Sequence, residues 1–91
     1  MRESTIEKAV CSYAKSKGCL ILKLAGMNQR GQPDRMFIRD GKSLFIEFKS
    51  PGKNPTALQI KWLLDLTTQG MNAMWCNSIA DGKKLIDRIF I

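Results

Sequence analysis

Apolar residues recur along this chain with two periods, and the change between them predicts helices alternating with strands. From Ile6 to Ala14 they return every three or four positions, which places them on one side of a helix. Shorter apolar runs bounded by Gly, Pro or Asp have the length of strands. The predicted elements are helix 4–17, strand 19–24, strand 34–39, strand 43–49, helix 54–70, strand 71–76 and a closing helix from residue 78. This order predicts an α/β fold with a helix on each face of a sheet.

Local signals predict where these elements begin. Ser4 and Glu7 have the S-x-x-E spacing of a capping box, so the first helix should open there. Asn54 followed by Pro55 predicts the N-cap and first residue of the second helix, and Ser78 predicts the cap of the third. An Asp-Gly pair between the second and third strands predicts a hairpin. The third and fourth strands, joined through a helix, should run parallel.

Composition narrows the class of protein and its partner. The 91 residues, 44% hydrophobic and 25% charged, are ordinary for one globular domain that spans residues 1–91. Fifteen Lys and Arg against eight Asp and Glu give a net charge of +7, which predicts a polyanionic partner. Nucleic acid is favoured over membrane because the sequence has neither a basic amphipathic helix nor an apolar segment of membrane-spanning length. With no apolar leader, we expect a cytoplasmic protein.

The absence of histidine restricts the possible chemistry. Three cysteines without a C-x-x-C spacing, and no histidine, exclude a zinc finger. Histidine is also the commonest general base of hydrolases. Any catalysis must therefore use carboxylates, lysine and a metal.

The candidate chemistry lies between residues 31 and 49. Asp34 follows Gly31-Gln32-Pro33 and should open the second strand, while Glu47 and Lys49 are two apart on the third and so share a face. Two carboxylates and an ammonium would then surround one point. Such a set provides oxygen ligands for a hard cation and a positive charge near an attacking water or a phosphorane.

A purely structural interpretation of this pattern is also open. Pro-Asp is a common turn, and an E-x-K on an exposed strand is often a solvated stripe. The neighbours of Glu47 argue against it, because Leu44, Phe45, Ile46 and Phe48 predict a strand that is buried on both faces. A charged pair inside such a strand is costly unless it is paired or bound to a metal.

Three further polar residues are candidates for a functional role. Glu7 falls within the apolar arc of its helix and is either a helix cap or an active-site acid. Gln59 lies among core positions, where its amide needs partners. It would bond a loop carbonyl, or orient Lys49 or a scissile phosphate. Arg30, in a polar loop at residues 26–31, is suited to contact a backbone phosphate.

Taken together, the helix Glu, G-x-P-D, E-x-K and the Q-x-x-W of Gln59-Ile60-Lys61-Trp62 resemble the PD-(D/E)xK nuclease superfamily. Within it, the chain resembles a stand-alone VRR-NUC domain of phages and bacteria, over essentially its whole length. The resemblance implies a restriction-endonuclease-like αβββαβ core, with a mixed four-stranded sheet flanked by helices. It also implies that the protein acts in the cytoplasm of a bacterial or phage-infected host cell.

The same resemblance implies roles for individual residues. The catalytic set would be Glu7, Asp34, Glu47, Lys49 and Gln59. Mg²⁺ or Mn²⁺ would be held by Asp34, Glu47 and the backbone carbonyl of Phe48. Lys49 would orient or activate the water and stabilise the phosphorane. Glu7 would be the helix acid, with Glu3 one turn earlier as its competitor.

We therefore expect a metal-dependent DNA endonuclease that cuts branched DNA, such as Holliday junctions, as a homodimer. The alternative is a non-catalytic nucleic-acid-binding protein that retains the fold. A sequence-specific restriction enzyme is weaker still, because 91 residues leave no room for a base-reading domain. The dimer would use apolar residues that exceed what a small core needs. These residues are Met27, Met36, Phe37, Met71, Met74, Trp75, Phe90 and Ile91.

Overall fold

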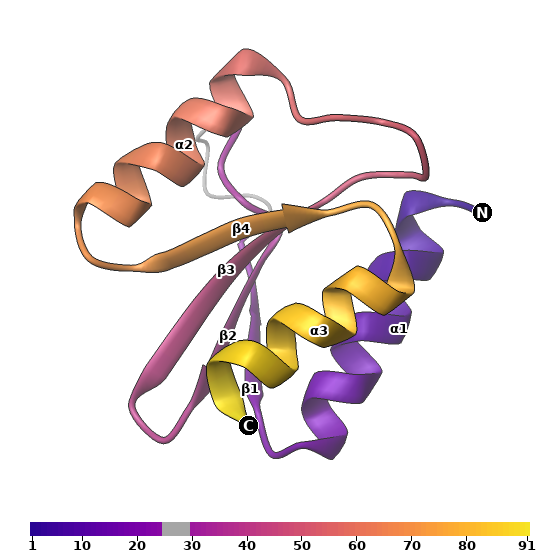
Figure 1. Ribbon diagram of the computed structural model, residues 1–91, viewed down its shortest axis with the longest axis vertical. Helices are drawn as coiled ribbons and strands as arrows, with labels where there is room; N and C mark the ends of the chain where they lie inside the picture. Colours follow the sequence, from indigo (N-terminus) through magenta and orange to yellow (C-terminus); the bar gives the residue numbers. More distant parts are fainter. Residues whose placement is uncertain (25–29) are drawn as a thin grey trace.

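The apolar runs of the sequence form one four-stranded sheet, and the amphipathic segments form helices on its two sides (Figure 1). The computed structural model describes residues 1–24 and 30–91. Its elements are α1 (Glu3–Ser16), β1 (Leu20–Lys23), β2 (Arg35–Arg39), β3 (Lys42–Phe48), α2 (Ala57–Thr68), β4 (Asn72–Cys76) and α3 (Ile79–Phe90). The predicted fold class, a mixed sheet flanked by helices, is confirmed.

Strand order in the sheet is β1-β2-β3-β4. The β1–β2 and β2–β3 pairs are antiparallel, and the β3–β4 pair, which α2 connects, is parallel as predicted. The hairpin between β2 and β3 turns at Asp40 and Gly41, whose φ angles of 51° and 76° are the left-handed values of a type I′ turn. This turn fixes the β2–β3 register, which places Arg35 opposite Ile46.

The main core lies between the sheet and the pair α1 and α3. Successive strand residues point to opposite faces, so alternate positions of β2 and β3 enter this core. Its fully buried side chains are Ile6, Val10, Ala14, Phe37, Leu44, Ile46, Phe48 and Ile86. The two helices pack closely, since a Cβ added at Gly82 of α3 would lie 2.3 Å from Cγ2 of Val10.

Helix α1 starts earlier than predicted. Its first residue is Glu3, and Arg2 occupies the N-cap position without a side-chain capping bond. Ser4 and Glu7 therefore lie inside the helix, and the predicted capping box is wrong. The physical reason is tertiary, because the Glu7 carboxylate instead accepts a hydrogen bond from Arg35.

Helix α2 is capped by Thr56, so the prediction of Asn54 as cap and Pro55 as first residue is also wrong. Thr56 and Gln59 form a reciprocal capping box, with Gln59 N–H donating to Thr56 Oγ1 at 3.2 Å and Thr56 N–H to Gln59 Oε1 at 2.8 Å. The predicted cap of α3 is confirmed, because Ser78 Oγ accepts from the Asp81 N–H at 3.1 Å.

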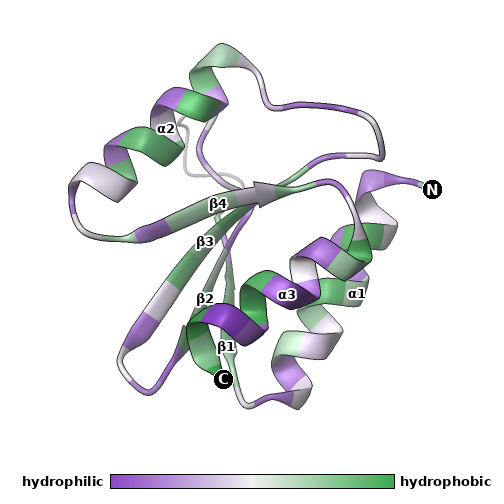
Figure 2. Ribbon diagram, in the orientation of Figure 1, coloured by the Kyte–Doolittle hydropathy of each residue, from purple (hydrophilic) through white to green (hydrophobic). Residues whose placement is uncertain are grey.

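Helix α2 lies on the other side of the sheet, against β4, and covers only part of that face (Figure 1). Its apolar residues are buried only in part, since Leu63 is buried but Leu58 is exposed. On the edge strand β1, Leu20 and Leu22 remain 61% and 42% exposed. The connection between β3 and α2, residues 49–56, is hydrophilic (Figure 2).

Two of the apolar residues predicted to be surplus belong to the core instead. Phe37 is fully buried and Phe90 is 5% exposed. Ile91 is 71% exposed. Met27 and most of the predicted loop at residues 26–31 lie outside the described residues. In the described part of the chain, no helix is long and apolar enough to cross a membrane.

Candidate metal centre

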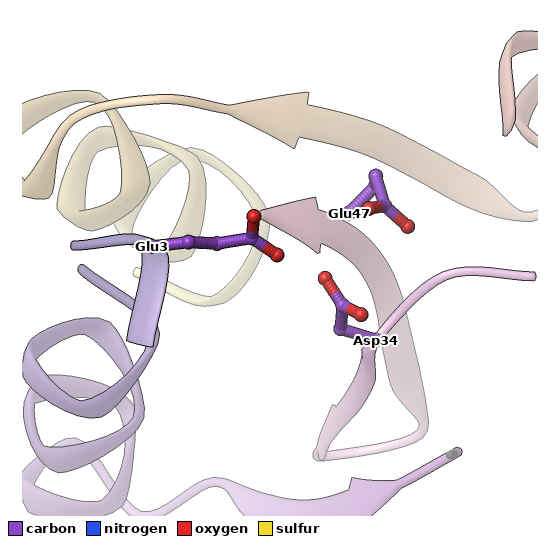
Figure 3. A group of neighbouring side chains, drawn as sticks. All are labelled: Glu3, Asp34 and Glu47. Atoms are coloured by element: carbon purple, nitrogen blue, oxygen red, sulfur yellow. The ribbon is translucent and has the colours of Figure 1, made fainter. Parts of the chain in front are cut away.

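Three carboxylates from three separate elements converge where β2 begins and β3 ends. Glu3 is the first residue of α1, Asp34 precedes β2, and Glu47 is the next-to-last residue of β3. Each offers an oxygen, and these atoms all lie within 4.8 Å of one another. Figure 3 shows the Glu3 side chain extending from α1 toward the two strand acids. Such a spacing allows one cation to contact all three side chains.

The β2–β3 pairing brings Asp34 to the end of β3. The backbone N–H of Asp34 donates to the Ile46 carbonyl at 3.1 Å, which joins the residue before β2 to β3. Pro33, which is buried, has no N–H and cannot extend the ladder further. The side chain of Asp34 provides the next contact with β3, since its Oδ2 accepts a hydrogen bond from the Phe48 N–H at 2.8 Å. Asp34 is therefore held both by its own backbone and by the end of β3.

Among the acidic residues that the structure describes, Glu47 is the one that is buried, with 3% of its surface exposed. Its Oε2 accepts from Gln59 Nε2 at 3.2 Å and lies 3.7 Å from Lys49 Nζ. Its Oε1 is buried and has no hydrogen-bond partner among the described residues. An unpartnered buried carboxylate oxygen is costly, and a hard cation that prefers oxygen ligands would satisfy it. The residues present therefore fit a divalent metal ion.

The electrostatics of the three acids agree with this interpretation. Burial, followed by the charge of Asp34, raises the pKa of Glu47 from its ordinary value of 4.5 to about 8. Burial is also the largest cause of the raised pKa of Asp34, although the Phe48 N–H acts in the opposite direction. The pKa of Glu3 is raised by burial and by Asp34. Without a cation, the site thus disfavours the charged forms of its own carboxyl groups.

Lys49 lies where the E-x-K spacing predicts, beside Glu47. Its side chain is only 16% exposed, although it follows the last residue of β3. The Lys49 N–H donates to the Cys76 carbonyl at 2.9 Å, so the backbone still pairs with β4 at this point. This pairing fixes the direction in which the side chain leaves the strand, and the ammonium lies 3.7 Å from Glu47 Oε2.

Among residues 1–24 and 30–91, the Gln59 side chain has two hydrogen-bond partners, and neither is a loop carbonyl or Lys49. Its carbonyl oxygen caps α2 through Thr56, while its amide nitrogen donates to Glu47. The side chain therefore connects the first turn of α2 to the buried acid. The signal for the cap, T-x-x-Q at residues 56–59, was present in the sequence.

Glu7, the expected helix acid, does not join the group of three carboxylates. Its Oε2 lies 2.6 Å from Nε of Arg35, in an ion pair whose side chains are 21% and 24% exposed. Glu3, four residues earlier and on the same side of the helix, lies beside Asp34 and Glu47 instead. Arg35, which the sequence reasoning missed, directly follows Asp34 and holds the first half of α1 on β2.

The predicted backbone ligand, Phe48, also faces the site. Its N–H points to Asp34. Because the N–H and C=O of one strand residue point to the same neighbouring strand, the Phe48 carbonyl is directed to the Asp34 side as well. The backbone of Phe48 therefore adjoins Asp34, one of the three carboxylates.

Comparison with known proteins agrees with the fold. No protein-family profile matches the chain. The chain is 37% identical over 62 residues to "Putative nuclease p44" of Acyrthosiphon pisum secondary endosymbiont phage 1, a match that covers 67% of each chain. It is also similar to a solved structure described as "VRR_NUC domain", with a TM-score of 0.83, 24% sequence identity, and coverage of 93% of this chain and 94% of the other.

Proposed function

Because the chain belongs to the VRR-NUC family, we propose that it is a nuclease that hydrolyses phosphodiester bonds of DNA with Mg²⁺ or Mn²⁺. The observation that carries this proposal is Oε1 of Glu47, which has no hydrogen-bond partner in the described part of the chain. It is buried within a group of three carboxylates and beside an ammonium. A binding surface for DNA needs positive charge and has no use for buried acids. A phosphodiesterase needs both kinds of group at one point.

The residues that would hold the ion are Glu3, Asp34 and Glu47, together with the Phe48 carbonyl. When bound, the ion would polarise the phosphate and offset the negative charge that develops on its oxygens. Asp34 is already fixed for this purpose by the Phe48 N–H. Gln59 keeps one oxygen of Glu47 occupied, so that Oε1 would be the oxygen left for the ion.

Lys49 would act on the substrate. Its ammonium lies 3.7 Å from Glu47 Oε2, so it would be near a water that approaches the phosphorus atom. From this position it would orient the water and stabilise the charge of the pentavalent transition state. Burial strengthens that interaction, because little solvent screens it.

For the helix acid we propose Glu3 in place of Glu7. Glu3 supplies an oxygen to the carboxylate group, whereas Glu7 is engaged by Arg35. Glu7 and Arg35 would then keep α1 in the position that brings Glu3 to the site. Replacing Glu3 by Gln should consequently reduce metal binding more than replacing Glu7 by Gln, which titration calorimetry can measure.

The decisive experiment compares cleavage of a synthetic four-way junction and a matched linear duplex, each with Mg²⁺, Mn²⁺ or EDTA. We expect cleavage with either metal, none with EDTA, and preference for the junction. Glu47→Gln serves as the matched inactive control. Metal-independent DNA binding without cleavage would instead favour the non-catalytic alternative.

The proposed preference for branched DNA also requires two active sites, because a four-way junction is resolved by two symmetric cuts. A C₂ dimer would supply them. The exposed Leu20 and Leu22 on the edge strand β1 are candidate contacts for a second copy, since exposed apolar groups that cluster often mark interfaces. Light scattering at micromolar concentration should report about twice the 10.3 kDa chain mass. A monomer that still cuts both strands of a junction in one binding event would refute the dimer.

A further inference from the structure

Helix α2 contacts both of the segments that carry the strand acids. Gln59 in its first turn donates to Glu47 Oε2 at 3.2 Å. Trp62, three residues later, donates its indole N–H to the backbone carbonyl of Arg30 at 2.7 Å. Residues three apart on a helix are neighbours on its surface. One face of α2 therefore bonds to β3 and to the chain that leads into Asp34.

The contact between helix α2 and that chain is close at Gly31. Gly31 has a φ of +78°, a left-handed conformation that favours glycine. A Cβ at this position would lie 2.7 Å from Cγ of Leu58 and 3.2 Å from Cδ1 of Trp62. The backbone at Gly31 is thus pressed against the side chains of α2.

The path from Gly31 to the acid is short and stiff. Gln32 donates its side-chain amide to the Leu24 carbonyl, at the end of the preceding strand. Pro33 follows with a fixed φ and is buried. Asp34 is the next residue. A displacement of Arg30 and Gly31 would therefore be transmitted to the Asp34 carboxylate.

We propose that Trp62 is a positioning residue of the metal centre. Its indole N–H and ring hold Arg30 and Gly31 against α2, and the same helix holds Glu47 through Gln59. Helix α2 thereby adds a second restraint, besides the contacts between Asp34 and β3, on the distance between the Asp34 and Glu47 carboxylates. This inference rests on the proposed metal-dependent function, and it assigns Trp62 no contact with metal or DNA.

Geometry explains why the indole N–H matters beyond packing. Trp62 is only partly buried and its neighbour Leu58 is 45% exposed. Apolar burial alone therefore holds Arg30 and Gly31 only weakly against α2. A hydrogen bond to a backbone carbonyl adds a fixed direction and distance. Catalytic and metal-binding groups lose much of their efficiency when they are displaced by about 1 Å.

The test is Trp62→Phe, which keeps an aromatic ring but removes the N–H donor. Mn²⁺ affinity, measured by electron paramagnetic resonance of the free ion, and kcat for junction cleavage should both fall about 10- to 100-fold, as for other residues that orient ligands. KM and DNA affinity in EDTA should not change. Raising the Mn²⁺ concentration should restore part of the rate.

Two further variants keep this test decisive. Gly31→Ala should give the same losses with Trp62 intact, because its Cβ would push the segment away from α2. Leu63→Ala, a change at the buried neighbour of Trp62, should lower the melting temperature but leave the Mn²⁺ affinity of the folded protein unchanged.

Trp62→Phe with the Mn²⁺ affinity and kcat of the parent protein would overturn the proposal. Weaker DNA binding in EDTA would overturn it too, because Trp62 would then contact the substrate. A parent protein that binds Mn²⁺ but cuts no DNA would refute the proposed function alone. In that case the Mn²⁺ affinities of Trp62→Phe and Gly31→Ala would still decide whether Trp62 positions the acids.

Discussion

The face of the sheet that α1 and α3 cover differs in kind from the end of the sheet where β2 begins and β3 ends. On the covered face, apolar side chains pack without exposure, and Gly82 lies so close to Val10 that no Cβ fits between the helices. At the sheet end, three carboxylates crowd together and the buried Glu47 Oε1 has no partner among the described residues.

Strand β3 contributes to both regions, and this teaches how one small sheet serves two purposes. Ile46 and Phe48 point into the core, whereas Glu47 between them points to the opposite face, toward α2. Burial stabilises the apolar side chains of Ile46 and Phe48, whereas it destabilises the charged form of Glu47. Substitutions in the two regions should therefore have different consequences. A change in the core should lower the stability of the fold, and a change at the sheet end should lower the activity.

The largest effect should come from Asp34→Asn. Loss of one metal-holding charge should lower the cleavage rate by at least about 100-fold, the upper range for residues that only support metal ligands. Stability in EDTA should not fall, because one of three crowded charges is removed. DNA affinity, measured by fluorescence anisotropy, should persist because it depends on the basic surface. Turnover at the parent rate with limiting Mg²⁺ would contradict the assignment.

Lys49→Ala should come next, with a loss of about 100-fold in rate, typical of a group that stabilises transition-state charge. Metal affinity should not weaken, because the change removes a positive charge from the neighbourhood of a cation. Isothermal titration of Mn²⁺ separates the two roles. If the variant no longer bound metal, Lys49 would have a structural role instead.

Gly82→Ala probes the other region. Its Cβ would lie 2.3 Å from Val10 Cγ2 and 3.3 Å from Cys76 Sγ. Overpacking of this kind costs about 1–3 kcal/mol. Alanine recovers about 1 kcal/mol as a better helix former, so the free energy of unfolding in urea should fall by up to about 2 kcal/mol. Lys84→Ala on the exposed side of α3 is the control, and kcat should be unchanged in both. If Gly82→Ala reduced kcat without changing the stability, the two regions would not be distinct in the way described.

The effect that should build up most gradually is the pH dependence of stability without metal. The pKa of Glu47 in the folded protein is about 8, raised from 4.5, and Asp34 and Glu3 shift in the same direction. The folded state then binds more protons than the unfolded state between these values. Stability in EDTA should be greatest below pH 4.5 as far as this group contributes, and should fall as the pH rises through 8. Glu47→Gln should flatten that decline in thermal melts, and an equal decline in both proteins would count against the burial of this charge.

Features of the fold that depend on neighbouring residues could be predicted from the sequence. The Asp40-Gly41 turn and the Ser78 cap act within a few residues, and both were placed correctly. The second helix offered two competing caps, and the reciprocal bonds of Thr56 with Gln59 prevail over Asn54. Helix starts were therefore the least certain boundaries, because several residues near each start can cap.

The site was predictable in its strand residues and less so in its helix residue. The two-residue spacing of Glu47 and Lys49 is enough to place them together. The choice between Glu3 and Glu7 depends on which turn of α1 passes the end of the sheet, and Arg35 decides it by binding Glu7 across 28 positions of sequence. Likewise, the bond from Trp62 to Arg30 ends on a backbone carbonyl, which no residue pattern identifies.

The most direct test of the metal centre is calorimetric titration of Mn²⁺ at pH 8 into the parent protein and into Glu47→Gln, both without DNA. Gln preserves the size of the side chain and its bond to Gln59 while removing the charge. We predict binding to the parent protein with release of a proton, visible as a dependence of the heat on the buffer, and affinity at least about tenfold weaker in the variant. Equal Mn²⁺ affinity in the two proteins would contradict the metal centre at Glu3, Asp34 and Glu47.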